Sequence, residues 1–243
     1  MELIFVHGWG FGPDTWNGVL EHMSVDGSIN SSMVCVDLGF FQDSASNLAT
    51  RKNTKCVDEL SILNDWPSNA VVVGHSLGVL WLLKYAPSTI AGFVSVCGFD
   101  RFVPHIHKNT LLTMEQRLIR NPKRQLQQFW TACGLSNKET YSTLAECWRL
   151  QNGLRWLQNW DQTKQKNELP CPLMVLAGFN DNIVSQNMSA IIWENAPHFY
   201  NNILWHETAG HALPFHDPKW IANHLNRFIN DLEYRKSQET HCS

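Results

Sequence analysis

The feature that most constrains the fold is a strict alternation of short apolar runs and helical patterns over residues 1–100. Apolar runs bounded by turn-forming residues predict buried strands at 3–6, 33–36, 70–73 and 91–96. Patterns with a helical period follow the first three runs, at 14–23, 56–63 and 79–86. Continuous apolar strands that alternate with helices are typical of a parallel sheet covered on both faces.

The alternation is interrupted after residue 100. Only helical patterns follow, at 111–119, 123–133, 138–150 and 154–160, with Gly153 as a predicted break. Strands at 173–176 and 202–205 and helices at 185–195 and 220–232 then resume the alternation. We therefore expect an α/β fold, with a mostly parallel sheet, helices on both faces, and a four-helix lid inserted after the fourth strand.

The domain boundaries follow from the same pattern. Residues 1–103 and 168–243 are expected to form the two parts of one core domain, with a polar tail from about residue 236. Residues 104–167 are expected to form the helical lid. Because the lid lies between two core strands, it should cover the carboxyl ends of the strands, where ligands of an open parallel sheet bind.

Length and composition limit the class of protein. The 243 residues fit one large α/β domain. No apolar run approaches the roughly 20 residues that a membrane helix needs, and the first residues lack a signal-peptide pattern. The seven cysteines are scattered without a Cys-x-x-Cys spacing, which favours reduced thiols over a disulfide framework or a zinc site. We expect a cytoplasmic monomer that needs no metal or cofactor and binds neither nucleic acid nor membrane.

Charge is unevenly distributed along the chain. Residues 101–168 carry 11 basic and 5 acidic side chains, whereas the rest of the chain carries 8 basic and 17 acidic ones. A basic segment in an acidic chain indicates contact with an anionic partner, although a solvated helical face would have the same composition.

Three residues suited to nucleophilic catalysis follow predicted strands. Ser76 lies in Gly74-His75-Ser76-Leu77-Gly78, a Gly-x-Ser-x-Gly turn between a strand and a helix. Asp181 and His211 follow the last two strands, so the sheet should bring all three to one edge. A histidine can take the serine proton during attack, and a carboxylate fixes the tautomer of the histidine. We predict a catalytic triad of Ser76, His211 and Asp181.

The chain resembles the α/β-hydrolase superfamily at four landmarks. These are His7-Gly8-Trp9-Gly10, the Ser76 turn, Gly178-Phe179-Asn180-Asp181 and Gly210-His211-Ala212-Leu213-Pro214-Phe215. Their order matches the Ser, Asp, His order of that superfamily, and the match covers roughly 1–100 and 168–232. The resemblance implies an oxyanion hole built from the backbone N–H groups of Trp9 and Leu77.

Other residues near these landmarks compete for the same roles. Asp100 follows the fourth predicted strand, at an alternative position for the acid. Asp217 precedes Pro218 and is interpreted as a helix cap. His7 is interpreted as a brace for the glycine-rich turn and His75 as a packed residue of the serine turn, while His216 lacks the preceding glycine.

Within the superfamily, the chain resembles the pimeloyl-acyl-carrier-protein methyl ester esterases of biotin synthesis. The parallels include Val6-His7-Gly8-Trp9-Gly10, Trp16, Gln128-Phe129-Trp130 and the residues that follow His211. The resemblance implies an acyl-carrier-protein partner and an acyl channel beside Trp9, Ser76, Leu77 and His211, lined by Phe129, Trp130, Thr131, Ala132 and Cys133. It also implies a carrier-binding position at Arg124, which Arg117, Arg120 and Lys123 would extend.

Two alternatives remain open. His75 stands where this esterase family often has Trp, which leaves a general short-chain carboxylesterase or a C–C bond hydrolase. The other alternative is a non-catalytic ligand-binding protein on a hydrolase fold.

Overall fold

The computed structural model describes residues 1–25, 32–42, 44–48, 53–135, 145–194, 196–198 and 202–241. Its centre is a seven-stranded sheet with the strand order β3-β2-β1-β4-β5-β6-β7, in which every pairing is parallel. The strands are β1 (Glu2–Val6), β2 (Ser32–Asp37), β3 (Thr54–Asp58), β4 (Val71–His75), β5 (Gly92–Val96), β6 (Leu173–Gly178) and β7 (Leu204–His206). The predicted α/β fold with a parallel sheet is confirmed.

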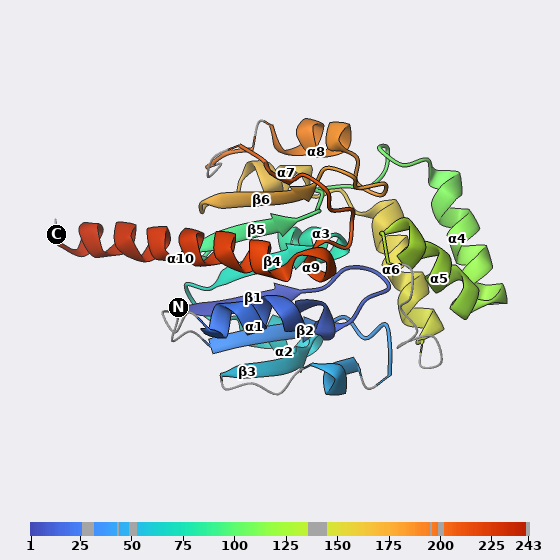
Figure 1. Ribbon diagram of the computed structural model, residues 1–243, viewed down its shortest axis with the longest axis horizontal. Helices are drawn as coiled ribbons and strands as arrows, with labels where there is room; N and C mark the ends of the chain where they lie inside the picture. The colour runs from blue at the N-terminus through green and yellow to red at the C-terminus, as the bar shows by residue number, and fades with distance from the viewer. Residues whose placement is uncertain are drawn as a thin grey trace.

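Helices cover both faces of the sheet (Figure 1). On one face lie α1 (Asn17–Val25) and α10 (Pro218–His241), which contact each other. On the other lie α2 (Glu59–Asn64), α3 (Leu77–Tyr85) and α8 (Gln186–Trp193). Within β1, Leu3 and Phe5 belong to the apolar cluster with α1 and α10, whereas Ile4 and Val6 belong to the opposite cluster. Successive side chains of a strand point to opposite faces of the sheet, so β1 contributes to the apolar cluster on each face.

The expected helix at 56–63 is wrong in its first half. Thr54–Asp58 form β3, which pairs with β2 at the edge of the sheet, and the helix α2 begins only at Glu59. The run that was expected to be the fourth strand is therefore β5. The error has a physical cause, because β3 is a half-exposed edge strand without the apolar run that marks the central strands.

A helical insertion joins β5 to β6 and lies beyond the carboxyl ends of the strands (Figure 1). In the described residues, α4 (Lys108–Arg120), α5 (Pro122–Ala132) and α6 (Cys147–Asn159) lie there, whereas α7 (Thr163–Asn167) lies beside β6 and contacts α3 of the core. The two ends of the segment that contains α4, α5 and α6 meet, because Arg101 and Asp161 form an antiparallel bridge and their side chains pair at 3.3 Å.

The predicted break at Gly153 is wrong, because this glycine lies inside α6. A Cβ there would lie 2.6 Å from Cδ1 of Trp9 and 3.0 Å from the ring of Phe40, so the glycine permits close packing and does not end the helix. The predicted helices at 138–150 and 154–160 are one helix over the described residues, and positions 136–144 lie outside them.

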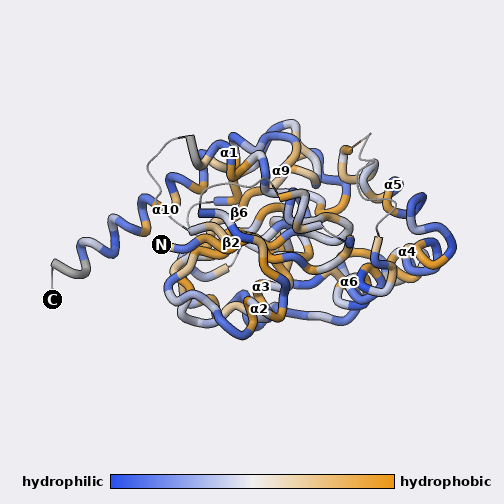
Figure 2. The backbone as a smooth tube through the Cα atoms, turned by 90° about the horizontal axis from the view of Figure 1, so that it is seen from below, coloured by the Kyte–Doolittle hydropathy of each residue, from blue (hydrophilic) through white to orange (hydrophobic). Residues whose placement is uncertain are grey.

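The polar segment expected from about residue 236 is helical, because α10 continues to His241. Its last turns project past the body of the molecule and are hydrophilic, whereas apolar segments gather in the interior (Figure 2). Among the described residues, no helix has both the length and the apolar character that spanning a bilayer requires.

Candidate active site

Ser76 occupies a sharp turn between β4 and α3. Its backbone has φ 54° and ψ −119°, in the region that L-residues rarely adopt and that marks a strained functional turn. The flanking glycines have no space for a side chain. A Cβ on Gly74 would lie 2.7 Å from the nitrogen of Val79, and one on Gly78 would lie 2.3 Å from the carbonyl oxygen of Val6. The turn thus requires glycine on both sides of the serine, as the sequence predicts.

Ser76, His211 and Asp181 form one hydrogen-bonded array. Oγ of Ser76 lies 2.8 Å from Nε2 of His211. Nδ1 of the same ring lies 2.8 Å from Oδ2 of Asp181. Because an ionised carboxylate only accepts, Nδ1–H donates to Asp181, and Nε2 accepts from the serine hydroxyl. The structure therefore brings the three predicted residues together in the geometry that activates a serine.

Asp181 is fixed by its own loop. Its Oδ1 accepts hydrogen bonds from the backbone N–H groups of Ile183, at 2.7 Å, and Val184, at 2.8 Å, so Oδ2 is directed at His211. These two backbone donors fix the orientation of the carboxylate.

The rival acid, Asp100, has a different partner. It lies 3.1 Å from Nζ of Lys166, and both side chains are buried. The geometry therefore favours Asp181 as the partner of His211.

The glycine-rich turn after β1 packs against Ser76. A Cβ on Gly8 would lie 3.1 Å from Cβ of Ser76. His7 braces this turn, since its Nε2 accepts from the N–H of Leu38 at 3.0 Å and its Nδ1 lies 3.0 Å from the carbonyl oxygen of Gly8. Leu77 is the first residue of α3, so its N–H belongs to the positive end of the helix.

Two tryptophan side chains connect this turn to the helical insertion. The indole N–H of Trp9 donates to the carbonyl oxygen of Leu150 in α6 at 2.8 Å. The indole N–H of Trp130 in α5 donates to the carbonyl oxygen of Gly10, also at 2.8 Å. The insertion therefore holds the turn that contains Trp9 through two buried hydrogen bonds.

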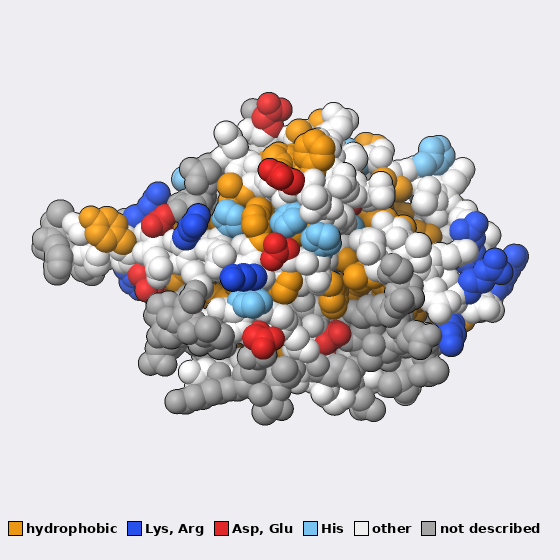
Figure 3. Space-filling model, viewed as in Figure 1, with side chains coloured by type: hydrophobic (Ala, Val, Ile, Leu, Met, Phe, Trp, Pro, Cys, Tyr) orange, Lys and Arg blue, Asp and Glu red, His pale blue; other side chains and the backbone are white. Residues whose placement is uncertain are grey.

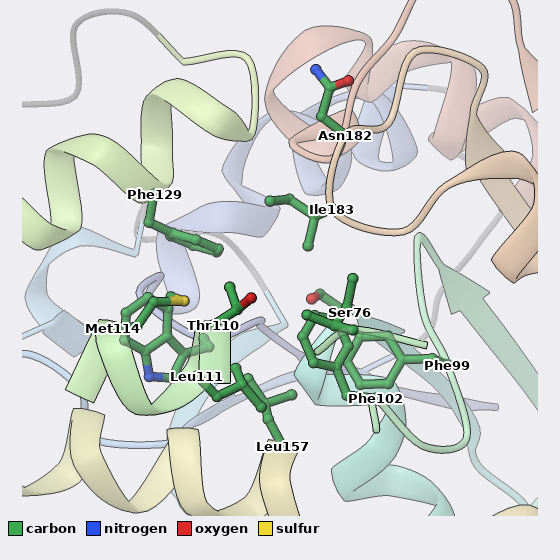
Figure 4. A pocket seen from close by; sticks show the side chains of 12 residues that line it. Ser76, Phe99, Phe102, Thr110, Leu111, Met114, Phe129, Leu157, Asn182 and Ile183 are labelled. Atoms are coloured by element: carbon green, nitrogen blue, oxygen red, sulfur yellow. The ribbon is translucent and has the colours of Figure 1, made fainter. Parts of the chain in front are cut away.

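A cavity of about 150 Å³ opens at Ser76. In Figure 4 the serine hydroxyl points into this cavity, between Phe129 of α5 on one side and Phe99 and Phe102 on the other. Nearly all of its lining is apolar, and it comprises Trp9, Ser76, Phe99, Phe102, Ile106, Thr110, Leu111, Met114, Phe129, Leu157, Asn182 and Ile183. Such a cavity suits an uncharged hydrocarbon group.

The residues expected to line an acyl channel lie in different places. Trp9, Ser76 and Phe129 line the cavity at Ser76. Trp130 and Cys133 are buried elsewhere, because the indole is directed at Gly10 and the Cys133 carbonyl accepts from the N–H of Ala212 at 3.1 Å.

Other predicted contacts lie outside the cavity wall. Thr131 and Ala132 are on the exposed face of α5, and Leu77 and His211 lie beside Ser76. A further wall of the cavity, which was not predicted from the sequence, is formed by Thr110, Leu111 and Met114 of α4. The spacing of Leu111 and Met114 on one helix face was the available signal.

A basic groove lies on the outer side of the insertion. Arg117, Arg120 and Arg124 line a depression of about 290 Å³ together with Asn121, Gln125 and Gln128. Figure 3 shows the basic side chains gathered at the end of the molecule where Figure 1 places α4 and α5. Three of the four predicted carrier-contact residues thus share one groove, and Lys123 is an exposed neighbour outside its lining.

The profile of the alpha/beta hydrolase family matches residues 3–224. The chain belongs to this family. Curated relatives carry the name pimeloyl-[acyl-carrier protein] methyl ester esterase, as the resemblance in the sequence suggests. The protein from Proteus mirabilis is 24% identical over 236 residues, which span 88% of this chain and 86% of that protein. One from Legionella pneumophila is 22% identical over 250 residues, which span 96% and 94%.

Two solved structures share the fold. An esterase from Exiguobacterium antarcticum superposes with a TM-score of 0.75 at 12% identity, and covers 95% of this chain and 92% of its own. A bromoperoxidase from Bacillus anthracis superposes with a TM-score of 0.73 at 14% identity, and covers 94% and 91%. The match to the alpha/beta hydrolase family and the names of the curated relatives confirm the expectation of a hydrolase.

In this hydrolase a third potential metal ligand lies beside the array. Cys97 is buried, and its thiol, the imidazole of His211 and the carboxylate of Asp181 have ligand atoms within 4.8 Å of one another. Burial and the nearby Asp181 raise the pKa of the thiol well above its ordinary value, so it stays protonated. Both ring nitrogens of His211 already have partners. The group is therefore better described as a hydrogen-bonded array than as a metal centre.

The remaining candidates near the array have structural partners. Asp217 caps α10 by accepting from the N–H of Trp220 at 2.9 Å, as the sequence suggests. Nε2 of His216 lies 3.4 Å from the hydroxyl of Thr208. Neither side chain takes part in the hydrogen bonds of the Ser76 array.

Proposed function

We propose that this protein is a serine carboxylesterase that hydrolyses the methyl ester of pimeloyl-acyl-carrier protein. The observation that carries the proposal is the array of Ser76, His211 and Asp181, which opens into an apolar cavity at Ser76. The basic groove beside this cavity and the names of the curated relatives support the choice of substrate.

The first half of the reaction forms an acyl-enzyme. Oγ of Ser76 attacks the ester carbonyl carbon while Nε2 of His211 takes the hydroxyl proton, and Asp181 stabilises the imidazolium. The carbonyl oxygen becomes an oxyanion that accepts hydrogen bonds from the N–H groups of Trp9 and Leu77. Each donor of this kind lowers the barrier by about 3 kcal/mol. When the intermediate collapses, the bond to the methoxy oxygen breaks, and His211 returns its proton to release methanol.

The second half of the reaction regenerates the enzyme. Water enters the space that methanol leaves, and His211 takes one of its protons as the oxygen attacks the acyl-enzyme carbonyl. The same two N–H groups stabilise the second oxyanion. Collapse breaks the bond to Ser76, whose oxygen recovers the proton from His211, and the free acid leaves.

The cavity selects an apolar chain. A dry cavity of about 150 Å³ lined by Leu, Ile and Phe holds a benzene-sized group of about six carbons, and the cavity at Ser76 has this volume and character. Each buried methylene contributes about 0.8 kcal/mol. We therefore expect kcat/KM on simple esters to rise about fourfold per added methylene until the cavity is full.

The basic groove supplies a site for an anionic carrier. Arg117, Arg120 and Arg124 extend from two neighbouring helices over one depression. Several guanidinium groups on one surface attract an acidic protein and accelerate its encounter at low salt. The groove and the cavity share α4 and α5, so a carrier bound at the groove would lie next to the cavity.

The proposed activity is tested with purified protein on two substrates. Pimeloyl-acyl-carrier protein methyl ester should yield methanol and the free acid, and p-nitrophenyl butyrate should yield p-nitrophenol. Ser76→Ala should lower kcat on both substrates by about 10⁶-fold. Hydrolysis of the small ester with none of the carrier-linked ester would leave a general carboxylesterase. Loss of neither activity in Ser76→Ala would exclude the serine mechanism.

The carrier groove is tested by charge reversal. Arg120→Glu should lower kcat/KM for the carrier-linked ester at least about tenfold at low salt and leave p-nitrophenyl butyrate unchanged. Lys164→Glu is the matched control, because Lys164 lies in the same insertion but outside the groove. Equal losses for both variants would indicate a general charge effect. In a biotin-requiring host that lacks its own methyl ester esterase, the gene should restore growth without biotin.

A further inference from the structure

His75 is a buried imidazole outside the Ser76 array. It is the last residue of β4, next to Ser76, and is fully buried. Its Nε2 lies 2.9 Å from the backbone carbonyl oxygen of His211. A carbonyl oxygen only accepts, so Nε2 carries the proton and donates it. His75 therefore connects the strand that ends at the nucleophile to the loop that carries the base.

The same ring contacts the turn that contains Trp9. A Cβ on Gly8 would lie 2.9 Å from Nδ1 of His75, so backbone and ring are in close contact. The ring of Phe11 lies 5.5 Å from that of His75 in a T-shaped arrangement, and it also lies 5.5 Å from the ring of Phe215 in the short helix α9 (Leu213–His216), which follows His211. One imidazole thus contacts both loops that must be aligned with Ser76.

We propose that His75 is a positioning residue for the esterase reaction. Its Nε2–H fixes the backbone of His211, and its ring fixes Gly8, so the base and the Trp9 N–H keep their positions relative to the Ser76 oxygen. This inference rests on the proposed function. It differs from the interpretation of His75 as simple packing, because the hydrogen bond makes the donor, and not only the ring volume, necessary.

If His75 positions the reacting groups, its loss should lower the rate of the chemical step without weakening substrate binding. His75 does not line the cavity at Ser76. Removing its donor should displace the base loop and leave the His211 carbonyl buried without its partner. Displacements of about 1 Å can lower rates about 100-fold. We expect kcat to fall and KM to stay nearly constant.

The test compares His75→Phe, which keeps a ring without a donor, with His75→Gln, whose amide N–H can reach the same carbonyl. With p-nitrophenyl acetate as the substrate, His75→Phe should lower kcat about 10- to 30-fold at an unchanged KM. His75→Gln should recover kcat to within about threefold of the wild type. His224→Phe is the matched control, because it makes the same change in α10, where the ring packs on Trp220.

The outcomes separate the two proposals. A wild type without a burst of p-nitrophenol and without turnover would overturn the proposed function. Two outcomes would overturn the role of His75 and leave the proposed function intact. One is an active wild type and an unchanged kcat in His75→Phe, and the other is an equal loss of kcat in the Phe and Gln variants. A second measurement needs no variant. Nitrogen NMR of the labelled wild-type histidines should show the Nε2–H tautomer of His75, and the Nδ1–H tautomer would contradict the proposal.

Discussion

The indole N–H of Trp130 donates a hydrogen bond to the carbonyl oxygen of Gly10, 2.8 Å away, across 120 positions of the sequence. Gly10 has φ 68° and directly follows Trp9, whose backbone N–H is a proposed oxyanion donor. A helix of the insertion therefore fixes the backbone next to the reacting atoms. The insertion is part of the proposed catalytic machinery as well as a cover for it.

Replacing Trp130 by Phe should reduce catalysis as well as stability. The variant keeps most of the ring but leaves the Gly10 carbonyl buried without its donor, at a cost of about 1–3 kcal/mol. We expect kcat on p-nitrophenyl butyrate to fall about tenfold, with KM within about twofold. Trp193→Phe is the matched control, because its buried indole donates to the Gly98 carbonyl at 3.1 Å, away from the Trp9 turn. Equal kcat losses in both variants would contradict the prediction.

The acid of the array is tested by comparing two carboxylates. Asp181→Asn should lower kcat about 10⁴-fold, the size of the loss when the acid of a serine protease triad becomes an amide. The double variant Asp100→Asn with Lys166→Met removes the other carboxylate together with its ion-pair partner, and should keep kcat within about tenfold. A larger loss from the double variant than from Asp181→Asn would reverse the assignment.

The buried pair of Asp100 and Lys166 makes its own prediction for stability. Both side chains are buried, and Nζ of Lys166 also lies 2.6 Å from the carbonyl oxygen of Ile192. Lys166→Met leaves an uncompensated carboxylate in the interior and should lower the free energy of unfolding by about 3 kcal/mol. Adding Asp100→Asn should recover most of that loss in urea titrations. A double variant no more stable than Lys166→Met would exclude charge burial as the cause.

A pH-dependent contribution to stability is expected at the start of α2. Asp58 caps this helix, and hydrogen bonds from the backbone N–H and then the hydroxyl of Ser61 hold the pKa of its carboxyl below the ordinary value of 3.8. A lowered pKa in the folded state stabilises the protein above the unfolded pKa, and this contribution is lost as pH falls through the folded value.

Asp58→Ala should therefore lower the free energy of unfolding at neutral pH by at most about 1 kcal/mol, since the side chain is exposed. The difference from the wild type should vanish once the pH is well below 3.8. Urea titrations at both pH values measure it. Asp65→Ala, at the other end of the same helix, should show no such loss. A deficit that persists in acid would contradict the cap.

The centre of the sheet and the Ser76 array could be predicted from the sequence for a physical reason. Central parallel strands are buried on both faces, so they appear as unbroken apolar runs, and chemistry at their carboxyl ends appears as polar residues just after each run. Thr54–Asp58 has no such signal, because an edge strand is half exposed and Lys55 and Asp58 interrupt it. The sequence therefore predicts four strands before the insertion, where the described residues form five, β1 to β5.

The walls of the cavity were harder to predict, because they depend on tertiary packing. Helical spacing places Phe129 and Trp130 on the buried side of α5, but it does not say which of them reaches the cavity. The structure gives that position to Phe129 and directs Trp130 to Gly10. Gly153 shows the same limit, since only the packed structure reveals that Trp9 occupies the space a side chain would need.

The bridge between Arg101 and Asp161 has a consequence for how such enzymes diversify. Because the chain leaves the core and returns to it at adjacent residues, the segment between them can change in length or sequence without altering strand register. A donor segment grafted at these two positions should leave the sheet folded. It would have to bring its own partner for the Gly10 carbonyl, and this requirement limits which segments evolution or engineering can exchange.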